Sequence, residues 1–118
     1  MVRIVVGGQI GKKDIVALIE KHGSGKVEVK EMGDIEAALA VKNNAADYYF
    51  GACNTGGGGA LAMATAILGM DVCATLSIPG KIKTDEEIER EVKLNKKAFG
   101  FTFQHAEQIV PVILRFLS

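Results

Sequence analysis

Short apolar runs alternate with helical segments along this chain, and that alternation constrains the fold more than any other feature. Such an alternation is typical of βαβ units, in which parallel strands are joined by crossover helices. We therefore expect an α/β domain of three layers, with a doubly wound parallel sheet of about four strands. The expected strands are residues 4–6, 27–30, 48–50 and 72–76.

The helices that should connect these strands have recognisable start signals. Asp14 and Asp34 are placed to cap the first two helices through their side-chain oxygens. Residues 60–68 form a third helix of small and apolar residues, and the run Thr84-Asp85-Glu86-Glu87 indicates a capping box before a charged fourth helix. The apolar face of this fourth helix is expected to hold Ile88, Val92 and Phe99.

The second strand identifies the edge of the sheet. Residues 27–30 alternate apolar and charged side chains, as a half-exposed strand does. Right-handed crossovers then favour the strand order 2-1-3-4. The winding reverses between the first and third strands of that order, and ligands of open α/β sheets bind at such a switch point.

A run of four glycines, Gly56 to Gly59, separates the third strand from its helix. Glycines leave their backbone N–H groups uncovered, so a loop of this kind at a helix N-terminus can bind an anion. A second glycine-bearing loop, residues 7–11, should meet it at the switch point. The alternative is a tight turn whose glycines only let helix and sheet pack closely.

Cys53 opens the glycine loop and is the candidate general base or nucleophile. A nearby helix N-terminus stabilises a thiolate and lowers the pKa of a cysteine, although a cysteine there can equally serve as a small buried apolar residue. Cys73, inside the fourth strand, is predicted to be inert. The candidate ligand-binding residues are Gly8, Gln9, Asn54, Thr55, Gly56, Gly57, Gly58 and Gly59.

Composition narrows the remaining function classes. The 118 residues fit a single domain, residues 1–118, and 14 basic residues balance 14 acidic ones. A neutral chain has no basic field for nucleic acid or an anionic membrane surface. Its apolar runs are too short for a signal peptide or membrane insertion, which indicates a cytoplasmic protein. Two separated cysteines and two isolated histidines, His22 and His105, predict no metal site, and no cofactor is indicated.

The C-terminal residues 109–117 contain seven large apolar side chains besides Pro111. A helix that is apolar all round must be buried on all sides. Either the domain's own core covers it or a second copy does. A closed homo-oligomer is the common solution for a cytoplasmic chain, so we expect at least a homodimer.

The run from Gly51 to Ala64, GACNTGGGGALAMA, resembles the YhfU-like proteins, a small uncharacterised bacterial family. The resemblance extends over the whole chain. It implies membership of a family without an established activity, and so no mechanism.

A more distant similarity is to the type B ribose-5-phosphate isomerases and their galactose-6-phosphate relatives. It rests on Ala46-Asp47, then Cys53-x-Thr55-Gly56-x-Gly58 and the alanine-rich helix. The resemblance implies a three-layer parallel fold, a dimer, Cys53 as the base that removes a proton from carbon, and the following loop as the anion-binding element. The chain departs from that family at Gly8-Gln9, where the isomerases have an Asp-His pair, and at Ala64, where they have an asparagine.

Three functions are compatible with these features. The first is binding of a small anionic ligand, such as a sugar phosphate, with isomerase-like proton transfer at Cys53. The second is a non-catalytic subunit of an oligomer, in an interaction or regulatory role. The third is a phosphotransferase-type carrier that is phosphorylated on Cys53.

Overall fold

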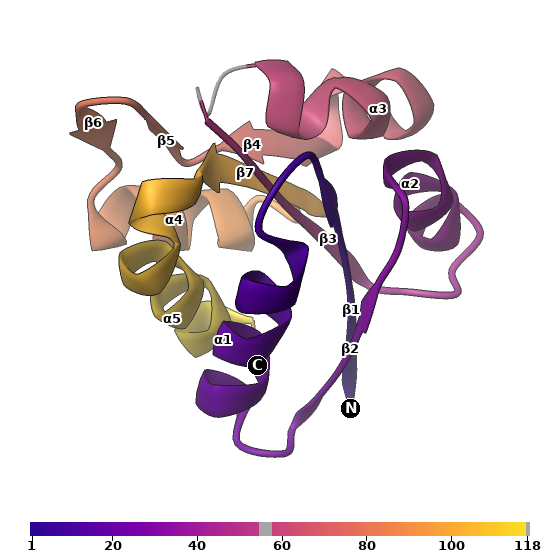
Figure 1. Cartoon of the computed structure of the whole chain (residues 1–118), viewed down its shortest axis with the longest axis horizontal. Coiled ribbons are helices and arrows are strands. Elements are labelled where there is room, and N and C mark those ends of the chain that lie inside the picture. The colour runs from indigo at the N-terminus through magenta and orange to yellow at the C-terminus, as the bar shows by residue number, and fades with distance from the viewer. Residues whose placement is uncertain (55–57, 118) are drawn as a thin grey trace.

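The computed structural model describes residues 1–54 and 58–117, and its centre is a five-stranded parallel sheet. The strand order is β2-β1-β3-β7-β4 (Figure 1). The strands are β1 (Val2–Gly8), β2 (Val27–Glu31), β3 (Tyr48–Cys53), β4 (Cys73–Thr75) and β7 (Ala98–Thr102). The predicted α/β class, the edge position of β2 and the relative order of the first four strands are confirmed.

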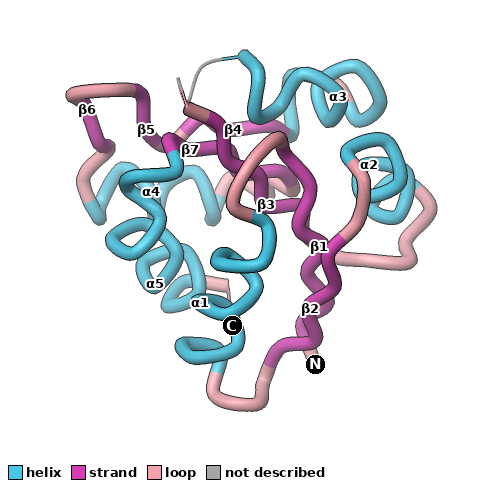
Figure 2. The backbone as a smooth tube through the Cα atoms, in the orientation of Figure 1, coloured by secondary structure: helices cyan, strands magenta, loops and turns pink. Residues whose placement is uncertain are grey.

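Five α-helices within the described residues cover the sheet in two outer layers, as expected for a doubly wound fold. Helix α5 packs against both α1 and α4 on one face, and α2 packs against α3 on the other (Figures 1 and 2). Their bounds are α1 (Lys12–Gly23), α2 (Asp34–Lys42), α3 (Gly58–Leu68), α4 (Asp85–Lys93) and α5 (Ala106–Phe116). None of the helices in the described part of the chain is long and apolar enough to span a bilayer.

The sequence analysis missed strand β7, which lies between β3 and β4. We expected Phe99 on the face of the fourth helix, and this is wrong. Helix α4 ends at Lys93, and Asn95 takes a left-handed φ of 65°, which stops the helix before the strand begins. All five residues of β7 are buried, so the strand lacks the alternation that marks a half-exposed one.

The predicted capping box of α4 is confirmed, but the caps predicted for α1 and α2 are wrong. Glu87 donates its backbone N–H to Thr84 Oγ1 at 3.2 Å, and Thr84 donates its own to Glu87 Oε1 at 2.9 Å. Helix α1 begins earlier than predicted, after Gly11. Asp34 is the first residue of α2, after Gly33, and its carboxylate has another role that is described below.

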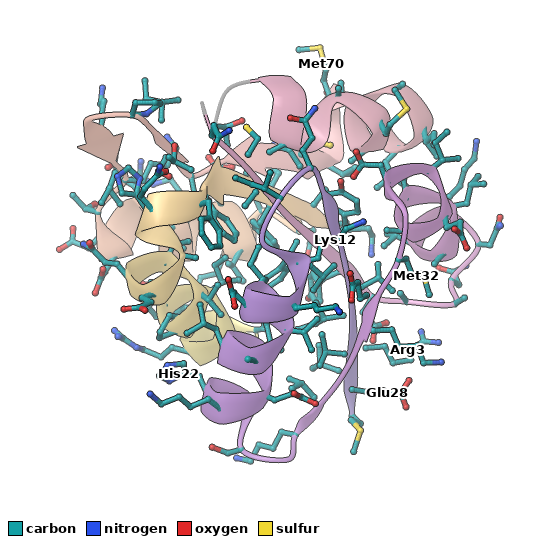
Figure 3. The ribbon with its side chains drawn as sticks, viewed as in Figure 1. Arg3, Lys12, His22, Glu28, Met32 and Met70 are labelled. Atoms are coloured by element: carbon teal, nitrogen blue, oxygen red, sulfur yellow. The ribbon has the colours of Figure 1, made fainter. Side chains whose placement is uncertain are left out.

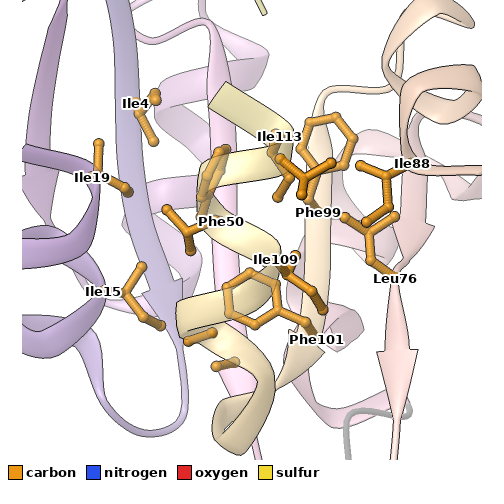
Figure 4. Packing of buried hydrophobic residues seen from close by; sticks show 14 of the residues in the cluster. Ile4, Ile15, Ile19, Phe50, Leu76, Ile88, Phe99, Phe101, Ile109 and Ile113 are labelled. Atoms are coloured by element: carbon orange, nitrogen blue, oxygen red, sulfur yellow. The ribbon is translucent and has the colours of Figure 1, made fainter. Parts of the chain in front are cut away.

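The core on the α1–α4–α5 side combines aromatic residues of the sheet with aliphatic residues of the helices (Figure 4). Phe50 and Phe99 meet edge to face, with ring centroids 5.9 Å apart. Much of the apolar C-terminal segment lies in this core. Helix α5 buries Ala106, Ile109, Val110, Val112 and Ile113 against the sheet and its two neighbouring helices. The chain itself therefore covers the inner face of α5.

Arg3 of β1 ties the start of β3 to the sheet. Its Nη2 lies 3.0 Å from Asp47 Oδ1, and its backbone N–H donates to Asp47 Oδ2 at 2.8 Å. The hydrogen bonds from Arg3 lower the pKa of Asp47 below its ordinary value. Glu28 of β2 lies in register with Arg3 and also favours the charged guanidinium (Figure 3).

Four short elements complete the fold of the described residues. Strands β5 (Ser77–Ile78) and β6 (Lys81–Ile82) form an antiparallel hairpin after β4. The 3₁₀ turns η1 (Met70–Val72) and η2 (Phe103–His105) precede β4 and α5. The hairpin and η2 both lie beyond the carboxyl ends of their strands, where the candidate site is expected.

Candidate functional site

The carboxyl ends of β1 and β3 form the switch point that the sequence predicted. The chain leaves β1 for α1 on one face of the sheet and β3 for α3 on the other (Figure 1). Gly8 lies in register with Ala52, and Gln9 donates its backbone N–H to the Ala52 carbonyl at 3.1 Å. The start of the glycine-bearing loop of residues 7–11 thus lies beside Ala52, the residue before Cys53.

The predicted site residues fall into three groups. Cys53 is the last residue of β3 and only 2% exposed, whereas Asn54 and Gln9 are exposed. Thr55, Gly56 and Gly57 lie outside the described residues. Gly58 and Gly59 are the first two residues of α3.

Two glycines of the sheet, Gly51 and Gly100, allow the first turn of α3 to lie close to it, because they have no side chains. A Cβ atom on Gly51 would lie 2.9 Å from the Ala60 carbonyl oxygen, and one on Gly100 would lie 2.6 Å from Leu61 Cγ. These glycines belong to the neighbouring strands β3 and β7. Residues two positions further along each strand, on the same face, therefore lie near the start of α3.

Those next residues are Cys53 and Thr102, which are register partners on β3 and β7. Partners on neighbouring parallel strands project to the same face of the sheet. Thr102 is 3% exposed, and its Oγ1 has no hydrogen-bond partner within the described part of the chain. A buried thiol and a buried hydroxyl therefore lie side by side next to the helix start.

Ser77 fixes the end of β7. It is 4% exposed, and its Oγ accepts the backbone N–H of Thr102 at 2.9 Å. The sequence analysis identified neither residue as part of the site. Thr102 belongs to the strand that it missed, and Ser77 directly follows the predicted fourth strand, residues 72–76.

The backbone N–H of Gly8 already has a hydrogen-bond partner, the carboxylate of Asp34 at the start of α2. Asp34 Oδ1 accepts the backbone N–H of Gly8 and lies 2.9 Å from the Tyr49 hydroxyl. The same hydroxyl is 3.2 Å from the Ala60 carbonyl oxygen. Burial, followed by the Asp34 charge, raises the pKa of Tyr49 well above its ordinary value. Tyr49 is therefore a neutral donor that joins α2 and α3 to the sheet.

Comparisons with known families and sequences found relatives that match nearly the whole chain. The model of a family described as protein of unknown function DUF2620 matches residues 2–117, nearly the whole chain. The chain belongs to this family. Uncharacterized protein YhfU of Escherichia coli strain K12 is 38% identical over 118 residues, which are 100% of both chains. The YhfU protein of Shigella flexneri matches with the same identity and coverage.

One solved structure has the same fold as this DUF2620 member. Ribose-5-phosphate isomerase B from Giardia lamblia superposes with a TM-score of 0.65 and 22% sequence identity. The match covers 99% of this chain and 87% of that one. Both resemblances drawn from the sequence are confirmed, the second at the level of the fold.

Cys73 differs from its prediction. We expected it inside a buried strand, but β4 is the edge strand of the sheet in this DUF2620 member, and Cys73 is partly exposed. Its Sγ lies 3.4 Å from the Gly69 carbonyl oxygen, and partial burial raises the pKa of the thiol. Cys73 sits at the start of β4 and Cys53 at the end of β3, at opposite ends of the parallel sheet.

Two hollows of this protein lie near the carboxyl ends of the strands. One, of about 180 Å³, is formed by the end of β4 and the hairpin, with Ser77, Lys81 and Lys83 in its lining. Another, of about 430 Å³, lies between α1 and the start of α5 and is lined by Asp14, Ala17, Leu18, Lys21, Phe103, Gln104, Ala106 and Glu107.

The charge of Lys12, next to the loop of residues 7–11, is directed to a backbone group: its Nζ donates to the Met32 carbonyl at 3.1 Å (Figure 3). Within residues 1–54 and 58–117, no group of acidic, cysteine and histidine side chains could hold a metal ion.

Proposed function

We propose that this protein binds a small anionic ligand, in the first instance a sugar phosphate, at the N-terminus of α3. The observation that carries the proposal is the pair Cys53 and Thr102, which lie side by side at the carboxyl ends of neighbouring strands, next to the helix start. The first N–H groups of a helix have no partner within the helix and favour an anion. Residues 53–59 are the proposed binding segment, with Gly8 and Gln9 bordering it.

The class of ligand is suggested by the structural neighbour, whose name assigns it to ribose 5-phosphate. A phosphate group supplies the anion, and the sugar would extend from it toward β3 and β7. We further propose that the protein acts in the cytoplasm, where sugar phosphates are abundant.

We also propose that Cys53 transfers a proton on the bound ligand. Its thiolate would take a proton from the carbon next to a carbonyl group and leave an enediolate. The thiol would then return the proton to the former carbonyl carbon, while the hydroxyl proton passes to the other oxygen of the enediolate, so the reaction consumes no oxidant or further reactant. Opening a sugar ring requires an acid or a base, and the residues Gly8-Gln9 carry neither. A substrate that is already open-chain therefore suits this site best.

Replacing Gly58 by valine is expected to abolish anion binding. A branched side chain on the first residue of α3 would block approach to the helix N–H groups. In the unchanged protein, ribose 5-phosphate at 100 times its dissociation constant should stabilise the fold by about 2.7 kcal/mol. Thermal unfolding with and without the ligand measures this difference.

The matched control is Ala62→Val, an exposed position in the same helix with the same branched side chain. It should keep the ligand-dependent stabilisation. If neither ribose 5-phosphate nor inorganic phosphate raises the melting temperature of the unchanged protein at millimolar concentration, the proposed function is wrong.

The proton transfer can be followed separately from binding. In D2O, the protein should exchange carbon-bound protons of ribose 5-phosphate, or of dihydroxyacetone phosphate, which is open-chain. Cys53→Ala should lose this exchange while Cys73→Ala keeps it, because Cys73 lies at the other end of the sheet. Equal exchange by the two variants, measured by proton NMR, would remove Cys53 from the mechanism and leave the binding proposal intact.

A second candidate function is assembly into a homo-oligomer through the α2–α3 layer. Large apolar side chains are exposed there, with Ile35 at 55%, Leu39 at 40% and Met63 at 36%. The sequence of α3 contains no charged residue. This face suits a second copy better than α5, whose inner residues lie in the core.

Light scattering is expected to give a mass of at least twice the 12.5 kDa of the chain. Leu39→Glu should reduce that mass to one chain by placing a charge in the interface. Ala17→Glu, which adds the same charge at an exposed position of α1 on the opposite layer, should not. A single-chain mass for the unchanged protein at micromolar concentration would contradict the assembly.

A further inference from the structure

Thr102 combines two features that a purely structural residue would not have. Its side chain is almost completely buried, yet its Oγ1 has no hydrogen-bond partner in the described part of the chain. A buried hydroxyl without a partner destabilises a fold, because water satisfied it in the unfolded chain. The backbone N–H of the same residue is satisfied by Ser77 Oγ at 2.9 Å. The end of β7 is thus held in place while the hydroxyl on it remains unused.

The direction of the Thr102 side chain follows from its strand. Ala98 packs in the cluster on the α2–α3 side, and a Cβ on Gly100 would meet Leu61 and Ala60 of α3. Successive even positions of β7 therefore face α3, and Thr102 is the next of them. Since Ala60 lies over Gly100, the start of α3 at Gly58 lies further toward Thr102.

Cys53 lies next to Thr102 on the same face, as its register partner on β3. Neighbouring strands are about 4.8 Å apart, so a single ligand atom can reach both side chains. Ser77 and Thr102 are the polar residues found buried in the described chain; Thr102 ends β7, and Ser77 of β5 accepts its backbone N–H. Buried polar groups are otherwise paired in folded proteins, which makes this unused hydroxyl informative.

We propose that Thr102 is a ligand-binding residue whose hydroxyl donates a hydrogen bond to an oxygen of the anion at the N-terminus of α3. This inference rests on the proposed function and adds a side-chain contact from β7. The anion would then be held between β7 and the first turn of α3. Its position would place the rest of the ligand over Cys53.

Two variants at this one position test the contact. Thr102→Val replaces the hydroxyl by a methyl group of similar size, and Thr102→Ser keeps the hydroxyl. Calorimetric titration with ribose 5-phosphate and with inorganic phosphate should show binding weakened about tenfold or more in Thr102→Val, the loss expected for a hydrogen bond to a charged group. Thr102→Ser should bind within about threefold of the unchanged protein.

The melting temperature without ligand separates a binding role from a structural one. Thr102→Val should melt at or above the unchanged protein, since it removes a buried hydroxyl without a partner. A residue that only holds the fold would give the opposite result, a lower melting temperature with unchanged affinity. If Thr102→Val does not fold, Thr102→Ala replaces it in the titration, again against Thr102→Ser.

The outcomes distinguish this inference from the function on which it rests. If the unchanged protein binds phosphate and Thr102→Val binds it equally well, Thr102 is not a ligand contact and the proposed function stands. A water molecule that partners the hydroxyl would give that result. If the unchanged protein binds neither probe, both proposals fail. Weakened binding in Thr102→Val with recovery in Thr102→Ser supports both.

Discussion

Truncating Phe99 to alanine is expected to lower the free energy of unfolding by about 3–5 kcal/mol, the range for a large buried aromatic residue. Phe99 is 0% exposed and lies on β7, an interior strand between β3 and β4. Its ring contacts Phe50 edge to face at 5.9 Å and Tyr48 at 6.2 Å. Buried aliphatic residues surround it, including Ile88 of α4, Ile113 of α5 and Leu76 between β4 and β5 (Figure 4). They cannot all move into the space that the ring would leave, so a cavity remains.

Urea unfolding followed by circular dichroism measures this loss, with Leu94→Ala as the control. Leu94 is 60% exposed, so its truncation should change stability by less than about 0.5 kcal/mol. The free energy of unfolding of a native domain is about 5–15 kcal/mol in total. The loss in the Phe99 variant is a large part of it, so this variant should unfold at a clearly lower urea concentration. A loss below about 1 kcal/mol with an unchanged urea dependence would show that the core repacks around the truncated residue.

The same residue shows how far the sequence can predict this fold. Strands β1 to β4 were predictable because each contains a short apolar or alternating run, and helical segments separate these runs along the chain. Strand β7 was not, since its five residues are buried on both faces and their pattern has no period. Only Asn95, with its left-handed backbone, marks the break after α4. Asparagine tolerates that conformation, but in the sequence it also fits a continuing helix surface.

The candidate site was predictable in part for a related reason. The two glycine-bearing loops are recognisable as local motifs, and the topology brings Gly8 beside Ala52 as expected. The side chains around them are long-range partners. Asp34 looked like a helix cap, and only the folded chain directs its carboxylate to Gly8 and Tyr49. Thr102 stayed unrecognised because its strand did.

Replacing Gly51 by alanine is expected to lower the free energy of unfolding by about 3 kcal/mol, at the upper end of the range for an overpacked core site. Gly51 has no left-handed φ, so the cost comes from space and not from backbone conformation. The new Cβ would lie 2.9 Å from the Ala60 carbonyl oxygen and 3.0 Å from the Tyr49 ring. The ring has little room to retreat, since Gly7 packs against its other edge so closely that a Cβ there would lie 2.7 Å from Tyr49 Cε2.

The first turn of α3 must therefore move away from the sheet in Gly51→Ala, and this links stability to the site. Displacement of Ala60 would carry Gly58 away from Cys53 and Thr102 and weaken the binding of ribose 5-phosphate at temperatures where the variant is still folded. Gly33→Ala is the control, because a Cβ there meets only the flexible Glu36 carboxylate at 3.2 Å. Gly33→Ala should lower the free energy of unfolding by less than about 1 kcal/mol and leave the binding of ribose 5-phosphate unchanged. Full affinity in a destabilised Gly51→Ala protein would show that the ligand does not depend on the position of α3.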